Sequence, residues 1–169
     1  MATGWRAIAL VLVLVWGLGA PRASKAELVR AKVLSIGDGD TLRVRQDGRT
    51  LTVRLASIDA PETAQHPFGA QARRHLQQRL PLGAPVGLNV KTRDRYGRLV
   101  AEVITEININ LALVDDGQAF AYRRYLKGCD ASAYLEAEQR ARLRHKGVWQ
   151  GPEGITRPWD FRRGLRPSP

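Results

Sequence analysis

The chain has 169 residues and a formal net charge of +11 at pH 7, which is enough length for one domain with one hydrophobic core. Cys129 is the only cysteine, so an intramolecular disulfide is excluded and the core alone must hold the fold. The basic excess favours polyanionic partners over cationic ones, although many small basic proteins bind no particular partner.

The first 26 residues have the pattern of an export signal. Residues 7–20 form an unbroken apolar run after Arg6, with the length of a signal-peptide hydrophobic region and too little for a comfortable membrane span. Ser24 and Ala26 offer small residues for cleavage. We therefore expect residues 1–26 to be a signal peptide and the mature protein to be secreted, extracellular or periplasmic, without stable membrane association. A retained membrane anchor is the alternative.

Three β-strands are predicted next. Residues 27–36 form the first, and residues 41–45 alternate between apolar and basic side chains. The turn at Asp47-Gly48 predicts a hairpin because both residues tolerate positive φ. Residues 50–55 alternate again, with Arg54 on the polar face. The three segments predict a β-meander.

Helices and two further strands follow. Residues 69–80 place apolar side chains at four-residue spacing and predict a helix that Pro81 ends. Residues 85–91 and 99–105 predict a second strand pair. Either Asn108 or Asn110 caps a short helix running to residue 116. A last helix is predicted from residue 130 through residue 146.

Five strands with a helix between the third and the fourth is the order of an OB-fold barrel, an α+β fold with about three helices. We expect this domain to span residues 27–150. The tail, residues 151–169, is rich in Pro, Gly and Arg and is expected to pack as an extended strap.

Acidic residues gather where predicted strands end. Asp40 lies in the turn between the first two strands, and Asp59 and Glu62 follow the third. If these strands are neighbours, the three carboxylates converge, and hard oxygen ligands of this kind suit calcium or magnesium better than zinc. The alternative is that Asp and Gly serve there only as turn formers.

Arginines near these acids could bind phosphate. Arg54 stands alone on the polar face of an apolar strand, and residues 93–98 (RDRYGR) form a basic turn. A planar guanidinium meets two phosphate oxygens at once, as phosphoryl transfer requires. Each arginine taken alone could equally be a solvated surface charge.

Several blocks together resemble the staphylococcal nuclease (thermonuclease) family of the bacterial secreted type. The blocks occur in the family's order, and the likeness covers about residues 29–149. They are residues 36–41 (IGDGDT), 53–55 (VRL), 58–62 (IDAPE), 94–98 (DRYGR) and 121–125 (AYRRY), with a further likeness in the tail at 158–162 (PWDFR).

The resemblance implies a role for each matching residue. It makes Asp40, Asp59, the Ala60 carbonyl and Thr41 the metal group, with Ca2+ as cofactor. Thr41, like Glu62, reaches the cation through water. Catalytic roles fall to Arg54, Glu62 and Arg98. Glu62 is the proposed general base, although it could instead position the attacking water, and residues 63–68 are shorter than the loop of the best-known member. The residues expected to contact substrate are Arg95, Tyr96, Tyr122 and Tyr125, of which Tyr125 could equally be a core residue.

The function implied is a calcium-dependent endonuclease (a phosphodiesterase, in the hydrolase class). It would cut DNA and RNA, leave 3′-phosphate ends and act as a monomer. The alternative is a non-catalytic nucleic-acid-binding OB-fold domain. Binding alone would not need all five of the acidic and basic site residues together, so their joint presence favours the enzyme. These residues are Asp40, Arg54, Asp59, Glu62 and Arg98. A structural surface protein with a basic exterior explains none of these coincidences.

Overall fold

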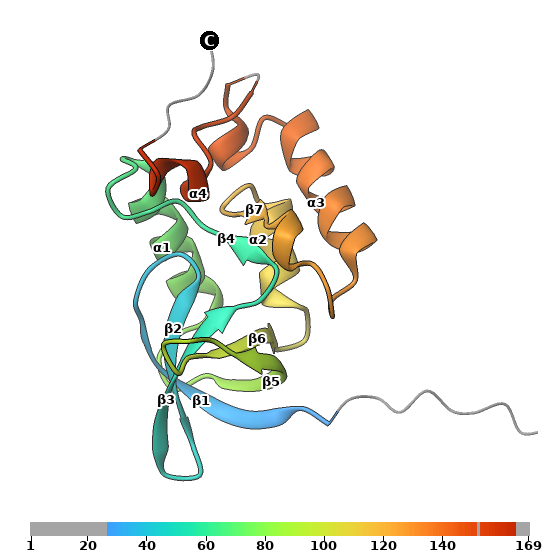
Figure 1. Ribbon diagram of the computed structural model, residues 1–169. Coiled ribbons are helices and arrows are strands. Elements are labelled where there is room, and N and C mark those ends of the chain that lie inside the picture. Colours follow the sequence, from blue (N-terminus) through green and yellow to red (C-terminus); the bar gives the residue numbers. More distant parts are fainter. Residues whose placement is uncertain (1–26, 152, 165–169) are drawn as a thin grey trace, which may run out of the picture.

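The computed structural model describes residues 27–151 and 153–164, so the predicted signal peptide lies outside the described residues. Five strands close into a barrel in the order β1-β2-β3-β6-β5, seen in the lower half of Figure 1. All neighbouring pairs are antiparallel except β3 and β6. The barrel strands are β1 (Val29–Ile36), β2 (Thr41–Gln46), β3 (Arg49–Leu55), β5 (Pro85–Arg93) and β6 (Leu99–Ile104). The predicted OB-fold barrel is confirmed.

The barrel encloses an apolar core because alternate side chains of each strand point inward. Leu42 and Val44 of β2, and Val53 of β3, have no exposed surface. The residues on either side of them in the sequence are exposed or partly exposed. The helix α1 (Phe68–Arg79) contributes Ala72 and Leu76 to the same core.

Outside the barrel, a two-stranded sheet pairs β4 (Ile58–Asp59) with β7 (Phe120–Ala121). Neither strand was predicted, because two residues show no periodicity. The helices α2 (Ile109–Asp115) and α3 (Ala131–Leu143) pack beside this sheet, opposite α1 in Figure 1. Within the described residues, no helix is both long and apolar enough to span a membrane.

The two asparagines proposed as alternative helix caps have different roles. Asn108 caps α2, its side chain accepting a hydrogen bond from the Leu111 amide. Asn110 is fully buried, accepts from the Val103 amide and donates to the carbonyls of Ala56 and Ala101. Asn110 therefore ties α2 to the barrel.

The end of the last long helix and the form of the tail were predicted wrongly. The helix α3 ends at Leu143, and His145 then takes a positive φ of 51°. This early turn lets Val148 and Trp149 bury against Phe120 in a second small core. A short turn, η2 (Gly147–Trp149), follows α3. The predicted tail beyond it is not extended throughout, because it contains α4 (Pro158–Phe161).

Candidate functional site

Asp40 is buried by the close packing of the loop between β1 and β2. A Cβ at Gly39 would lie 2.6 Å from the Ala60 Cβ and 2.8 Å from the Ala72 Cβ, so only glycine lets this loop rest on α1 and β4. The Asp38 side chain accepts a hydrogen bond from the Asp40 amide at 3.0 Å. Asp40 is thereby held at 2% exposure, at the start of β2.

Arg54 joins Asp40 to Asp59. It lies opposite Thr41 in the β2–β3 register, which puts its side chain at the barrel end where Asp40 sits. One guanidinium nitrogen pairs with Asp40 Oδ1, and the other donates to Asp59 Oδ1 at 2.6 Å. Asp59, on β4, has no exposed surface. The structure thus brings together three residues that lie in separate sequence motifs.

The charges in this cluster are only partly balanced. Burial, helped by the negative charges of Asp38 and Asp59, raises the pKa of Asp40 to about 7 despite the opposing effect of Arg54. Burial alone would lower the pKa of Arg54, but Asp40 and Asp59 raise it above its ordinary value. The cluster therefore gains from an added positive charge near Asp40.

Thr41 and Ala60 both contact Asp40 directly. The Thr41 hydroxyl donates to Asp40 Oδ1 at 3.2 Å, and the Ala60 amide donates to Asp40 Oδ2 at 2.8 Å. Both predicted metal-group residues therefore lie at the carboxylate. Cation coordination through the Ala60 carbonyl remains a prediction.

Glu62 lies beside Asp59 but does not touch the Asp40–Arg54 pair. Its carboxylate contacts Arg162, which also bonds Asp59. The turn that carries Glu62 rests on α1, because a Cβ at Gly69 would lie 2.2 Å from the Glu62 carbonyl oxygen. Gln65 Oε1 accepts a hydrogen bond from the Glu62 amide at 2.9 Å. The predicted convergence of three carboxylates is therefore indirect, through arginines.

The two buried carboxylates can still accept a cation. Among the described residues, no three His, Cys, Asp or Glu side chains form a metal-holding group by themselves. A carboxylate has about four acceptor positions. Hydrogen bonds from the described residues use three on Asp40 and three on Asp59, leaving one position on the Oδ2 atom of each. One oxygen from each, with carbonyl and water, is a donor set that fits the irregular coordination of calcium.

Arg98 does not contact this cluster. Its Nε donates to Asp94 Oδ2 at 2.7 Å within the β5–β6 turn. The register places the turn near Arg54, because Leu99 pairs with Val53 and Val100 with Arg54. Arg98 therefore lies on the barrel surface next to the cluster.

The predicted substrate-contacting residues form two aromatic and basic groups. In the β5–β6 turn, Tyr96 is 68% exposed and the Arg95 guanidinium lies 4.8 Å from its ring centroid. Beyond β7, Tyr122 meets Tyr125 edge-to-face at 4.7 Å. Tyr125 is exposed, so it is not a core residue. Trp159 stacks on Tyr122 at 4.8 Å and covers one face of its ring.

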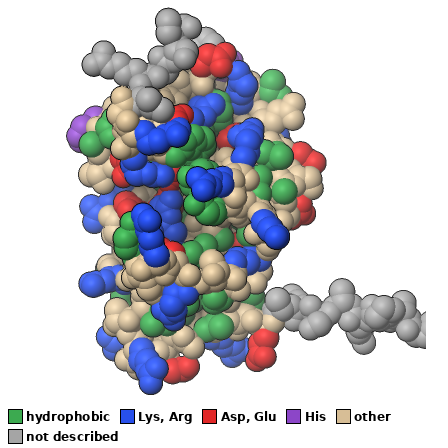
Figure 2. Space-filling model, in the orientation of Figure 1, with side chains coloured by type: hydrophobic (Ala, Val, Ile, Leu, Met, Phe, Trp, Pro, Cys, Tyr) green, Lys and Arg blue, Asp and Glu red, His purple; other side chains and the backbone are tan. Residues whose placement is uncertain are grey.

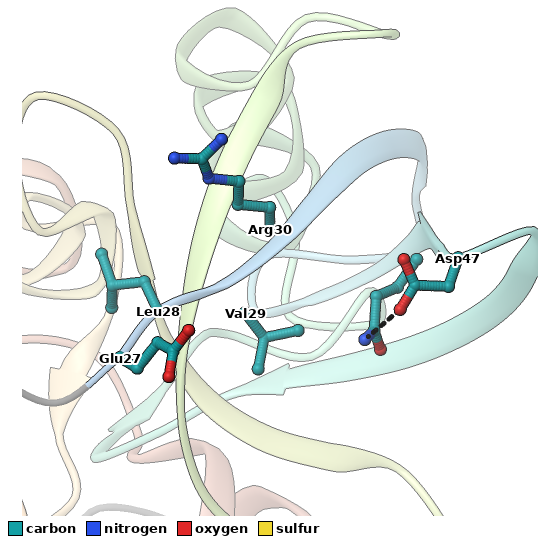
Figure 3. Close-up of a pocket in the computed structure, with 6 residues that line it drawn as sticks. Glu27, Leu28, Val29, Arg30 and Asp47 are labelled. Atoms are coloured by element: carbon teal, nitrogen blue, oxygen red, sulfur yellow. Dashed lines mark hydrogen bonds between the residues drawn. The ribbon is translucent and has the colours of Figure 1, made fainter.

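A shallow hollow elsewhere on the barrel is separate from these residues. It has a volume of about 380 Å³ and lies at the opposite end of β2 from Asp40 (Figure 3). Acidic and basic side chains both border it, so it is not selective for one sign of charge. Its lining residues are Glu27, Leu28, Val29, Arg30, Gln46 and Asp47.

Comparison with known proteins places this chain in a family. Residues 52–151 match the family described as staphylococcal nuclease homologue. The micrococcal nuclease of Shigella flexneri is 39% identical over 95% of this chain and 93% of its own. The chain belongs to the staphylococcal nuclease family.

Other relatives of this family agree. Protein ParB of Escherichia coli is 38% identical, covering 82% of this chain and 81% of its own. An endonuclease of Haemophilus influenzae is 37% identical, covering 83% and 77%. The family resemblance inferred from the motifs is thereby confirmed over most of the chain.

Two residues at the site were not predicted, Arg162 and Gln65. The tail block containing Arg162 was recognised, but its 103-residue separation from Asp59 hides the contact from local pattern. Gln65 is a buried polar residue at 8% exposure, and it links the Glu62 turn to the tail through the Thr156 carbonyl. A glutamine among loop residues gives no signal of such a link.

Proposed function

We propose that this chain is a calcium-dependent endonuclease that hydrolyses internal phosphodiester bonds of DNA and RNA and leaves 3′-phosphate ends. Family membership supports the coarser part, an endonuclease of the hydrolase class. The observation that carries the proposal is the pair of buried carboxylates, Asp40 and Asp59, joined by Arg54 and each keeping one acceptor position.

Each residue then has a chemical task. Asp40 and Asp59 would hold the cation, with Thr41 and the Ala60 carbonyl beside them. A bound divalent cation neutralises the phosphate and lowers the pKa of water. Glu62 positions the attacking water or takes its proton. Arg54 and Arg98 donate to the phosphoryl oxygens as negative charge develops there.

The surface fits a polyanionic substrate. Lys and Arg side chains are spread over the face seen in Figure 2, and acidic side chains are fewer. Such a surface attracts nucleic acid at long range. Arg95, Tyr96, Tyr122 and Tyr125 supply the mixture of positive charge and aromatic rings that binds phosphates and bases.

The test is cleavage of plasmid DNA by the purified mature chain in calcium, in magnesium and in chelator. Calcium should give cleavage and chelator none, and Asp40→Asn should abolish the calcium response. Asp47→Asn is the matched control, because it removes the same charge at the far end of β2 and Asn tolerates the positive φ of 47° there. Equal cleavage in chelator would rule out the metal mechanism.

We also propose that the protein is exported as a monomer after removal of residues 1–26. The apolar run after Arg6 supports the export and the removal of this segment. Sequencing the N-terminus of the exported protein should find residue 27 or a close neighbour. An exported chain that keeps Met1 would contradict the proposal.

A further inference from the structure

The C-terminal segment reaches the site from the far end of the chain and is firmly attached there. Trp159 stacks on Tyr122 with an interplanar angle of 5° and meets Phe120 edge-on at 6.1 Å. The Arg157 guanidinium lies 4.4 Å from the ring centroids of both Phe120 and Trp149. In Figure 1, α4 lies next to the end of α1.

A second attachment joins this segment to the turn that carries Glu62. The Gln65 side-chain amide nitrogen donates a hydrogen bond to the Thr156 carbonyl at 2.8 Å. The side-chain oxygen of Gln65 accepts a hydrogen bond from the Glu62 backbone amide. The segment is therefore fixed both by the aromatic stack and by the turn that carries Glu62. A side chain that directly follows a segment anchored in this way has a defined position.

Arg162, directly after α4, bridges two carboxylates of the site. Its Nη2 lies 2.8 Å from Asp59 Oδ2, and its Nη1 lies 3.2 Å from Asp59 Oδ1 and 2.5 Å from Glu62 Oε1. The planar fork of arginine suits such a bridge, whereas lysine offers a point charge.

The next residue provides a contrast. Arg163 pairs with Asp160 of its own helical turn and its side chain is 65% exposed. Arg162 and Arg163 have the same charge and neighbouring positions, but only Arg162 touches the site. Long-range attraction alone therefore does not account for the contact of Arg162.

We propose that Arg162 is a positioning residue of the nuclease, whose guanidinium holds the Glu62 carboxylate at a set place relative to Asp59. This inference rests on the proposed function. Arg162 leaves one acceptor position on Asp59 Oδ2, so the same carboxylate can bind a cation while it stays bonded to Arg162. Glu62 would then keep a fixed place relative to Asp59, from which it acts on the attacking water.

The test compares Arg162→Gln, Arg162→Lys and the control Arg163→Gln in cleavage of a labelled oligonucleotide at saturating calcium. Loss of a supporting residue of this kind typically lowers activity about 10–100-fold. We expect that fall in kcat for Arg162→Gln, with KM within roughly two-fold of wild type. Arg162→Lys should recover part of the loss, and Arg163→Gln should match wild type. Circular dichroism checks that each variant is folded.

Calcium affinity, measured by titration calorimetry, is the second readout. The Kd of Arg162→Gln should stay within several-fold of wild type, since Arg162 does not take the free acceptor position. Wild-type kcat in folded Arg162→Gln would overturn the role of Arg162 alone. Much tighter calcium binding with higher kcat would also overturn it, because Arg162 would then compete with the cation.

Two further results are decisive. If Arg162→Gln does not fold, the folded Lys variant decides: a kcat several-fold below wild type supports positioning and a wild-type kcat contradicts it. If the wild-type protein shows no calcium-stimulated cleavage, the proposed function fails first, and the role of Arg162 fails with it.

Discussion

Buried carboxylates occur at two places in this protein, Glu102 at one and Asp40 with Asp59 at the other. The two places differ in how many hydrogen-bond acceptor positions are occupied. Glu102, on β6, receives hydrogen bonds on both oxygens from Tyr134, Asn108, Asn89 and Lys91, which fill its acceptor positions. Asp40 and Asp59 each keep one position open after all bonds from the described residues. All three residues are at most 7% exposed, so low exposure alone does not mark the functional site.

The pKa values of Glu102 and Asp40 differ in the way that their hydrogen bonding predicts. Burial raises the pKa of Glu102, but hydrogen bonds from Lys91, Tyr134 and Asn108 bring it below the ordinary value of 4.5. Burial raises the pKa of Asp40 to about 7, and Arg54 compensates only in part. The hydrogen bonds to Glu102 therefore outweigh the effect of burial, whereas those to Asp40 do not.

The largest expected effects are on turnover at the site of Asp40 and Asp59. Arg54→Lys keeps a charge between Asp40 and Asp59 but removes the fork that reaches both. We expect kcat to fall about 100-fold or more, the scale for losing one preorganised donor to developing charge. Thermal melting should show that the variant is folded. A folded Arg54→Lys protein with normal kcat would remove Arg54 from the mechanism.

Arg98→Ala should lower kcat by a similar factor of about 100. Because Arg98 contacts only partly exposed groups, the Asp94 carboxylate and the Tyr96 ring, its loss should barely change the melting temperature. Arg93→Ala is the matched control on the same turn, since Arg93 bonds the Gly97 carbonyl and no carboxylate. Equal kinetics for the two variants would leave Arg98 without a special role.

Glu102→Gln should do the opposite and affect stability more than turnover. The amide cannot accept on both sides, so donors of the network lose a partner, at about 2 kcal/mol of unfolding free energy. Urea denaturation measures this loss, and cleavage by the folded variant should stay near wild type. A variant that is stable but inactive would mean that the Glu102 network serves the site.

The smallest effect is a pH dependence. Because folding lowers the pKa of Glu102, its ionisation stabilises the protein above the unfolded-state pKa, and this contribution is lost as pH falls through the lowered folded-state pKa. The difference in unfolding free energy between wild type and Glu102→Gln should therefore be largest near neutral pH and shrink below about pH 4. A difference that stays constant down to pH 3 would show that ionisation of Glu102 contributes nothing.

The barrel was predictable from the sequence, and the bonding of the site was not. Alternation in residues 41–45 and 50–55 reports which side chains face the core, and this pattern survives in the fold because one face is buried. The sequence singles out Asp59 by its motif, and it places Glu102 inside an apolar strand, but neither position tells how completely the carboxylate is bonded. Their difference comes from donors that folding brings from distant segments, Tyr134 to one and Arg162 to the other.

The tail shows the same limit. Its composition indicated an extended strap, yet four residues form α4 and place Arg162 at the site. A helix of one turn has no periodicity to read, and its position depends on the aromatic contacts of Trp159.

The most direct test of the open acceptor positions on Asp40 and Asp59 is the change in melting temperature with calcium for wild type, Asp40→Asn and Glu102→Gln. A ligand at about 100 times its Kd adds roughly 2.7 kcal/mol, or roughly 5–10 °C for a chain of this size. Wild type and Glu102→Gln should both gain this shift, and Asp40→Asn should gain little. An equal calcium shift in Asp40→Asn, or none in wild type, would contradict a cation site between Asp40 and Asp59.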